Sequence, residues 1–321
     1  MAEACAEPAI HVVRFHALMP VRDEADIIGQ SLAHLLKWAD SIYVFDTGSE
    51  DETWDIVNQF ASEDRRVIPL KRETVRFSDT RVRAWIFDQA RSHMRNGDWF
   101  LRVDADEFHH IVPREFVESR ISRHETVVYH QYYDFRLTSR DVEEWNSGRE
   151  GKKDRNRPIE ERRRWFTVTD YTEPRLCRYR SSMKWPAEVS FPYNAGFRAA
   201  TRIPIRHYPH RDPVQLQKRC RLRARVVQYL DNPVGHHWNE TDWRRHIVAN
   251  NNPALRFWNP GSELPVFRFR DHLSRLPKRL VQRLVQATCL PILDRLHAAY
   301  QRGAFPDTIP SARPVLTQNY P

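Results

Sequence analysis

Asp104 and Asp106 are two carboxylates only two residues apart, a spacing suited to binding a cation. They directly follow a short apolar run at 99–103. Carboxylates this close repel each other unless a cation or another polar partner lies between them. Oxygen ligands of this kind suit Mg²⁺ or Mn²⁺, and these cations in turn bind diphosphates. The D-x-D pair therefore predicts a divalent-cation site, although a bare pair also occurs by chance in surface loops.

Three segments that precede the D-x-D pair give it a context. They read ALMPVRDEADII at 17–28, IYVFDTGSEDET at 42–53 and FSDTRVRA at 77–84. With LRVDADEF at 101–108, they resemble the nucleotide-sugar half of the family 2 glycosyltransferases, which carry V-R-N-E, V-D-x-G-S-x-D-x-T, F-S-x-x-R-N-x-A and L-D-A-D-E in this order. The resemblance is specific over residues 12–110 and looser from there to about 212.

The chain departs from the family pattern without losing a carboxylate. Asp23 stands for the Asn of the first motif, Arg83 stands where the Asn-Ala spacing is usual, and Arg102 with Val103 replaces more apolar residues. The resemblance implies a GT-A fold and an inverting transfer of a sugar from a nucleotide-diphosphate sugar, expected to be of the UDP type. The acceptor would be a hydroxyl of a glycan or of a lipid-linked molecule in cell-surface glycan or polysaccharide synthesis.

The hydrophobic pattern predicts strands that alternate with helices. Strands are expected at 12–18, 41–45, 66–69 and 99–103. Helices are expected at 24–39, from a cap at Ser49 or Asp51 onward, and at 81–90. This order predicts an α/β domain with a mixed, mostly parallel sheet flanked by helices. Because ligands of such sheets bind outside the carboxyl ends of the strands, Arg22/Glu24, Asp46 and Asp104/Asp106 are expected to converge on one crevice.

The resemblance also implies a role for each residue that matches a motif. Nucleotide-sugar binding would fall on residues from the turns and strand ends: Pro20, Arg22, Glu24, Asp46, Gly48, Arg81, Asp104 and Arg178. For Asp46 the alternative is a purely local role, in which its side chain caps the following turn by bonding to backbone amides near Ser49.

A second informative region extends from 174 to 213. PRLCR at 174–178 resembles the P-R-L-F-R strand of small bacterial members, and IPIRHYP at 203–209 resembles the I-x-H-Y strand end. WPAEV at 185–189 stands where many relatives have V-H-E, so that Ala187 replaces the His and Glu188 keeps the carboxylate. The resemblance implies His207 as the third metal ligand beside Asp104 and Asp106. It implies Glu188 as the base, with Glu107 as the next candidate.

Both assignments have a structural alternative. His207 would then be a histidine bonded to backbone, and Glu188 would form an ion pair with a nearby arginine. The segment 140–164 is densely charged and contains few apolar residues, which predicts an exposed loop or a lid that orders over the bound donor. The expected domains are a GT-A domain at 10–212, with halves 10–110 and 111–212 and a charged loop at 136–165, and a mainly helical extension at 213–321.

Composition narrows the classes of partner. The net charge of +9 comes mostly from arginine, with only seven lysines among 51 basic residues. Arginine binds phosphate bidentately, which favours a diphosphate donor, but codon bias in a GC-rich genome explains the same composition. No nucleic acid is expected as a partner, because the sequence contains no zinc finger, no aromatic RNP-type motif and no clean basic stripe.

The sequence favours a cytoplasmic protein. It contains no run of eighteen apolar residues, and its first residues lack the basic and apolar regions of a signal peptide. The cysteines at 5, 177, 220 and 289 show neither metal spacing nor a disulfide framework. The amphipathic stretch 273–300 is expected to pack on its own domain or to contact an anionic membrane at its inner face.

Two other classes of protein remain as alternatives. A metal-dependent nucleotidyltransferase uses a similar sheet, but it usually has a Gly-rich phosphate loop near its start, and 19–28 contains no glycine. A catalytically silent scaffold of an envelope-assembly complex is expected to lose its carboxylates, whereas Asp46, Asp104, Asp106 and Glu188 are all present.

Overall fold

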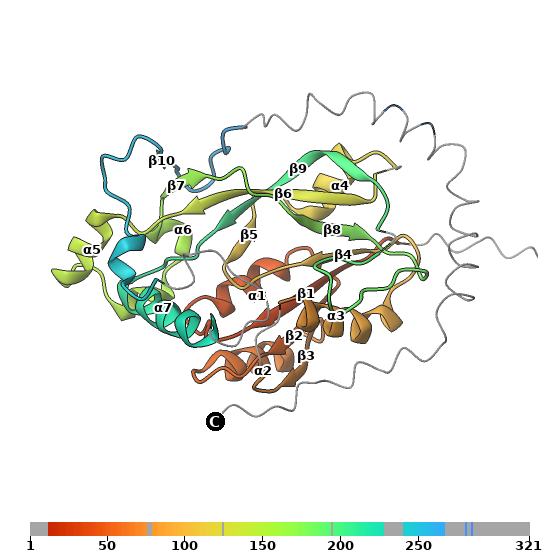
Figure 1. Cartoon of the computed structure of the whole chain (residues 1–321), viewed down its shortest axis with the longest axis horizontal. Helices are drawn as coiled ribbons and strands as arrows, with labels where there is room; N and C mark the ends of the chain where they lie inside the picture. Colours follow the sequence, from red (N-terminus) through yellow and green to blue (C-terminus); the bar gives the residue numbers. More distant parts are fainter. Residues whose placement is uncertain are drawn as a thin grey trace, which may run out of the picture.

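The computed structural model describes residues 12–75, 79–123, 125–193, 195–227 and 240–266, together with positions 280 and 284. Within them, one mixed sheet has the strand order β10-β7-β6-β8-β4-β1-β2-β3, and β9 pairs with β5 and β6. Helices flank this sheet (Figure 1). The strands are β1 (Phe15–Val21), β2 (Ser41–Asp46), β3 (Val67–Arg72), β4 (Trp99–Arg102), β5 (Glu107–His109), β6 (Val127–Phe135), β7 (Trp165–Val168), β8 (Pro174–Arg178), β9 (Arg198–His207) and β10 (Arg256–Phe257). The helices are α1 (Ile28–Leu35), α2 (Thr53–Glu63), α3 (Asp79–Ala90), α4 (Pro113–Arg120), α5 (Ser139–Asn146), α6 (Ile159–Arg162) and α7 (Pro213–Val227).

The strands β3, β2, β1 and β4 are parallel neighbours and bury apolar side chains on both faces. In β1, Ala17 and Met19 belong to the core cluster that includes Leu32 of α1, whereas Leu18 belongs to the cluster that includes Phe87 of α3. Successive side chains of a strand point to opposite faces, so helices on both faces are needed to cover them. This half confirms the predicted α/β alternation, with strand ends displaced by at most a few residues.

The second half of the sheet returns the chain to the first. Strand β8 pairs antiparallel with both β4 and β6, and β6 pairs parallel with β9. The short strand β5, which directly follows the D-x-D pair, lies antiparallel to β9 with Glu107 opposite His207. Residues about a hundred positions apart are therefore held side by side by backbone hydrogen bonds.

The segment 136–165 differs from the expected exposed loop. It contains α5, which begins with a capping box between Thr138 and Asp141, and the short helix α6. Its charges are partly buried: Glu150 Oε1 lies 2.9 Å from Arg162 Nε and 3.0 Å from Arg163 Nη2. Charge density predicted solvation, but opposite charges close in sequence neutralise one another instead.

Helix α7 begins at Pro213, which takes the first helical position, and Asp212 Oδ1 caps the helix by accepting a hydrogen bond from the Gln215 amide at 2.9 Å. The predicted amphipathic stretch 273–300 lies outside the described residues except for positions 280 and 284. No helix in the described part of the chain is long and apolar enough to cross a membrane. Cys177 and Cys220 are buried free thiols, and the other two cysteines lie outside the described residues.

Candidate active site

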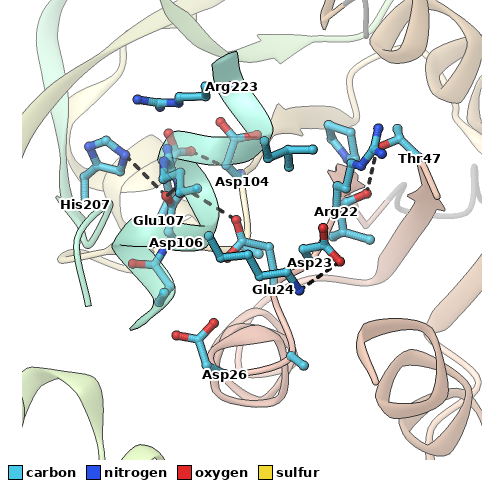
Figure 2. A pocket seen from close by; sticks show the side chains of 18 of the residues that line it. Arg22, Asp23, Glu24, Asp26, Thr47, Asp104, Asp106, Glu107, His207 and Arg223 are labelled. Carbon is cyan, nitrogen blue, oxygen red and sulfur yellow. Dashed lines mark hydrogen bonds and ion pairs between the residues drawn. The ribbon is translucent and has the colours of Figure 1, made fainter. Parts of the chain in front are cut away.

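A cavity of about 700 Å³ lies where the carboxyl ends of β1, β2 and β4 meet α7. It is lined by the loop after β1, the D-x-D segment, the start of β8 and one side of α7. Figure 2 shows His207, Asp106 and Glu107 on one side of this cavity and Arg22, Asp23 and Thr47 on the other. The crevice expected from the strand ends is therefore present, with α7 as an additional wall.

The loop after β1 is fixed to the loop after β2. The Asp23 amide donates to Ser49 Oγ at 2.9 Å, and the Glu50 amide donates to Asp23 Oδ1 at 2.8 Å. Asp23 has a φ of 55°, the left-handed region that Asn and Asp adopt more readily than other side chains. Asp in place of the family's Asn therefore preserves the backbone of this turn.

Asp46 and Gly48 build the neighbouring turn and do not line the cavity. Asp46 Oδ1 accepts hydrogen bonds from the amides of Gly48 at 2.9 Å and Ser49 at 2.7 Å. Gly48 has a φ of 101°, and a Cβ there would lie 2.6 Å from Thr74 Oγ1. The turn-capping role of Asp46 is thus observed. Its Oδ2 is buried and has no hydrogen-bond partner among the described residues, so nucleotide binding stays a prediction.

Arginines neutralise Asp104, the first aspartate of the pair. Arg83 Nη2 lies 2.5 Å from Asp104 Oδ1, and Arg175 Nη1 lies 3.5 Å from Asp104 Oδ2. Burial opposes ionisation, but the two guanidinium groups hold the pKa of Asp104 below its ordinary value. Arg83, which departs from the family motif, is therefore a site residue.

Asp106 faces three cations. Its Oδ2 lies 3.0 Å from Arg219 Nη1, 3.6 Å from His207 Nε2 and 3.9 Å from Arg211 Nη1. Burial opposes ionisation of Asp106, yet His207 and these arginines hold its pKa well below the ordinary value. His207 Nδ1 lies 2.7 Å from Asp134 Oδ1, so the other ring nitrogen is directed at Asp106.

The positions of these side chains bear directly on metal binding. Among the described residues, no group of three or more His, Cys, Asp or Glu side chains is placed to hold a metal ion. Asp104 is directed at arginines, so the predicted three-ligand set is not assembled. Asp106 and His207 do fit as a pair, because Asp134 orients the imidazole as carboxylates commonly orient metal-binding histidines.

Arg211 ties the loop after β1 to α7. It is buried, lies 2.7 Å from Asp26 Oδ2 through Nε, and also bonds to Glu24 Oε2. Burial raises the pKa of Glu24 to about 7 in spite of Arg211, with the nearby charge of Asp106 acting in the same direction. Glu24 thus lines the cavity, and its ion pair with Arg211 links the loop after β1 to the segment that precedes α7.

A second corner of the cavity is formed by β5, β6 and β8. Arg175 Nη2 lies 2.6 Å from Glu107 Oε1 and 3.0 Å from Glu173 Oε1. The Tyr132 hydroxyl donates to Glu107, and the exposed ring of Tyr171 places its hydroxyl 3.0 Å from Glu173 Oε2. This corner combines an accessible aromatic ring with carboxylates held by a buried arginine.

The structure brings most of the predicted site residues together. Seven line the cavity: Pro20, Arg22, Glu24, Asp104, Asp106, Glu107 and His207. Arg81 does not, because its side chain is exposed on α3 and the next two residues face the cavity instead. Arg178 lies opposite Trp99, at the other end of β4. Glu188 is exposed and does not line the cavity, so the structure gives no support to it as the base.

Sequence reasoning missed the basic residues of the cavity wall. Arg175 precedes Leu176 in a segment matched only as a strand, and Lys218, Arg219 and Arg223 come from a helix assigned to the extension. A signal was present, because residues 219 and 223 are one helical turn apart and share a face of α7.

Comparison with known protein families identifies the family of this chain. Residues 17–183, more than half of the chain, match the model of glycosyl transferase family 2, and the chain belongs to that family. The family membership confirms the resemblance, and the mixed α/β sheet is the GT-A architecture that it implied. No curated protein matches the chain.

Two solved structures are similar over part of their length. One is a mannosyltransferase from Pyrobaculum calidifontis in complex with GDP-Man and Mn²⁺, with 15% identity, 75% of this chain and 71% of that chain covered, and a TM-score of 0.38. The other is glucosyl-3-phosphoglycerate synthase from Mycobacterium tuberculosis in complex with Mn²⁺, UDP and glucosyl-3-phosphoglycerate, with 20% identity and a TM-score of 0.24. The second match covers 41% of this chain and 47% of the synthase, less than half its length.

Proposed function

We propose that this chain is an inverting glycosyltransferase that moves a sugar from a nucleotide-diphosphate sugar to an acceptor hydroxyl. The observation that carries the proposal is the cavity in which the loop after β1 faces the D-x-D carboxylates, within a chain of family 2. The expected donor is of the UDP type. The expected acceptor is a glycan or a lipid-linked molecule in cell-surface glycan synthesis.

A divalent cation, Mn²⁺ or Mg²⁺, fits the proposal at Asp106 and His207. Cations of this kind are commonly held by one or two protein side chains together with substrate phosphates, so a third protein ligand is not required. The cation would neutralise charge that develops on the departing nucleoside diphosphate. Asp134 would keep the His207 ring in the orientation needed, through the 2.7 Å contact at Nδ1.

The base of the proposed reaction should lie on the side of the cavity away from the loop after β1. Glu107 and Glu173 both line the cavity there, and Tyr171 adds an accessible aromatic ring for an acceptor. A general base contributes roughly 10²–10⁴-fold to the rate, so replacing it by Gln should lower kcat by that factor with donor affinity little changed. A full kcat in both Gln variants would remove this pair from consideration.

The experiment that tests the proposed function is a screen of nucleotide sugars with Mn²⁺, followed by NMR analysis of the product formed with simple glycoside acceptors. We expect a nucleoside diphosphate as by-product and a new glycosidic bond of inverted anomeric configuration. A product of retained configuration would contradict the inverting mechanism. A parallel assay supplies a nucleoside triphosphate and a sugar phosphate. Release of pyrophosphate in that assay would instead identify a nucleotidyltransferase.

A further inference from the structure

The cations of α7 pair with the carboxylates that line the cavity. Lys218 Nζ lies 3.1 Å from Asp23 Oδ1 and 3.2 Å from Asp51 Oδ2. Arg219 Nη1 lies 3.0 Å from Asp106 Oδ2 and 3.8 Å from Glu24 Oε1. Carboxylates from the loops after β1, β2 and β4 are therefore neutralised by one turn of a single helix.

This arrangement conflicts with the proposed binding of a cation and a diphosphate. A divalent cation bound to Asp106 competes with Arg219 for the charge of this carboxylate, because the guanidinium group and the metal are like charges that repel each other. Binding of the cation therefore weakens the ion pair between Arg219 and Asp106, and the guanidinium group then favours another anion. A diphosphate bound to the same cation supplies that anion within the cavity.

We propose that Arg219 binds the donor diphosphate, and that its ion pair with Asp106 holds the substrate-free site until cation and diphosphate enter together. This inference rests on the proposed function, because it needs a diphosphate donor. Guanidinium groups bind phosphate oxygens through a planar fork of N–H donors, so Arg219 would exchange one acidic partner for another of matching geometry.

The exchange requires movement of a side chain and not of the helix. The start of α7 is fixed by Asp212, which caps the helix and lies 2.9 Å from Arg155 Nη2. Leu216 and Cys220 of the same helix are buried against Leu137. Arg223, one turn beyond Arg219, also lines the cavity (Figure 2). A cation on this wall therefore has room to reach a ligand in the cavity.

The test compares the full-length chain with its Arg219→Gln variant by titration calorimetry. The probes are Mn²⁺ alone, inorganic pyrophosphate with Mn²⁺, and UDP, GDP and UMP with Mn²⁺. Removing the competing guanidinium should tighten binding of Mn²⁺ alone by several-fold. The variant should bind pyrophosphate, UDP and GDP about 10- to 100-fold more weakly, the range of a lost charge-assisted contact, with a smaller loss for UMP.

The matched control is Arg221→Gln, because Arg221 is exposed on the same helix and does not line the cavity. Arg221→Gln should change neither the affinity for Mn²⁺ alone nor the affinity for pyrophosphate and the nucleoside diphosphates. If Arg219→Gln does not fold, Arg219→Lys replaces it and should lose pyrophosphate affinity while keeping the charge. The inference would be overturned if Arg219→Gln shifted the affinities for Mn²⁺ alone and for pyrophosphate in the same direction, or if it shifted neither of them. If the unmodified chain binds no metal and no nucleotide, the proposed function falls with it.

Discussion

At the scale of the residue, the site is made of acids that already have basic partners. Asp104 is paired with Arg83, Asp106 with Arg219, and Glu107 with Arg175. The carboxylates are therefore held in position before any ligand binds, and ligand binding must compete with these pairs. The sequence predicted the acids, because their spacing is local. It could not predict their basic partners, because Arg83, Arg219 and Arg175 come from other elements that only the fold brings near.

Gly48 is a backbone position on which the turn after β2 depends. We expect Gly48→Ala to destabilise the protein, because left-handed backbone costs a residue with a Cβ about 1–2 kcal/mol and the clash with Thr74 adds about 1–3 kcal/mol. Gly148 also has a positive φ of 75°, but a Cβ there meets nothing within 4 Å. Urea unfolding should therefore show a larger loss for Gly48→Ala than for Gly148→Ala. Equal losses would show that Thr74 moves aside freely.

At the scale of the element, periodicity predicted the strands and helices of the first half, because each strand is buried on two faces and each helix on one. It did not predict the segment 136–165, where the decisive interactions are between charges. Here Arg162 and Arg163 are buried by pairing with Glu150, a pattern that composition alone assigns to solvent. The burial of this charged segment can be predicted only when the pairing of its individual charges is known.

Glu150 is expected to be essential to this segment. Glu150→Gln leaves two buried guanidinium groups without their shared carboxylate, and breaking a buried ion pair in this way typically costs about 3–5 kcal/mol. The control is Glu144→Gln, which disturbs only a surface pair with Arg140 and should cost less than about 1 kcal/mol. The measurement is the free energy of unfolding in urea. A loss for Glu150→Gln as small as that of the control would mean that water reaches both arginines.

At the scale of the whole molecule, three loops and one helix from both halves of the chain form a single cavity. The order of strands predicted where the loops meet, because carboxyl ends of parallel strands share one edge of the sheet. The contribution of α7 to the cavity was not predictable, because the basic sequence of a helix does not indicate where the helix will pack. Glu188 illustrates the same limit, because a motif resemblance gave it a role and its position in the fold leaves it outside the cavity.

The central claim is that this cavity binds a nucleoside diphosphate through a cation at Asp106. The most direct measurement is the Mn²⁺-dependent rise in melting temperature with UDP and GDP, for the unmodified chain and for Asp106→Asn. Exposed Asp55 on α2 gives the control, Asp55→Asn. We predict that the rise is retained in the control and lost in Asp106→Asn, with the fold intact by circular dichroism. A Mn²⁺-dependent rise of the same size in Asp106→Asn would contradict the account.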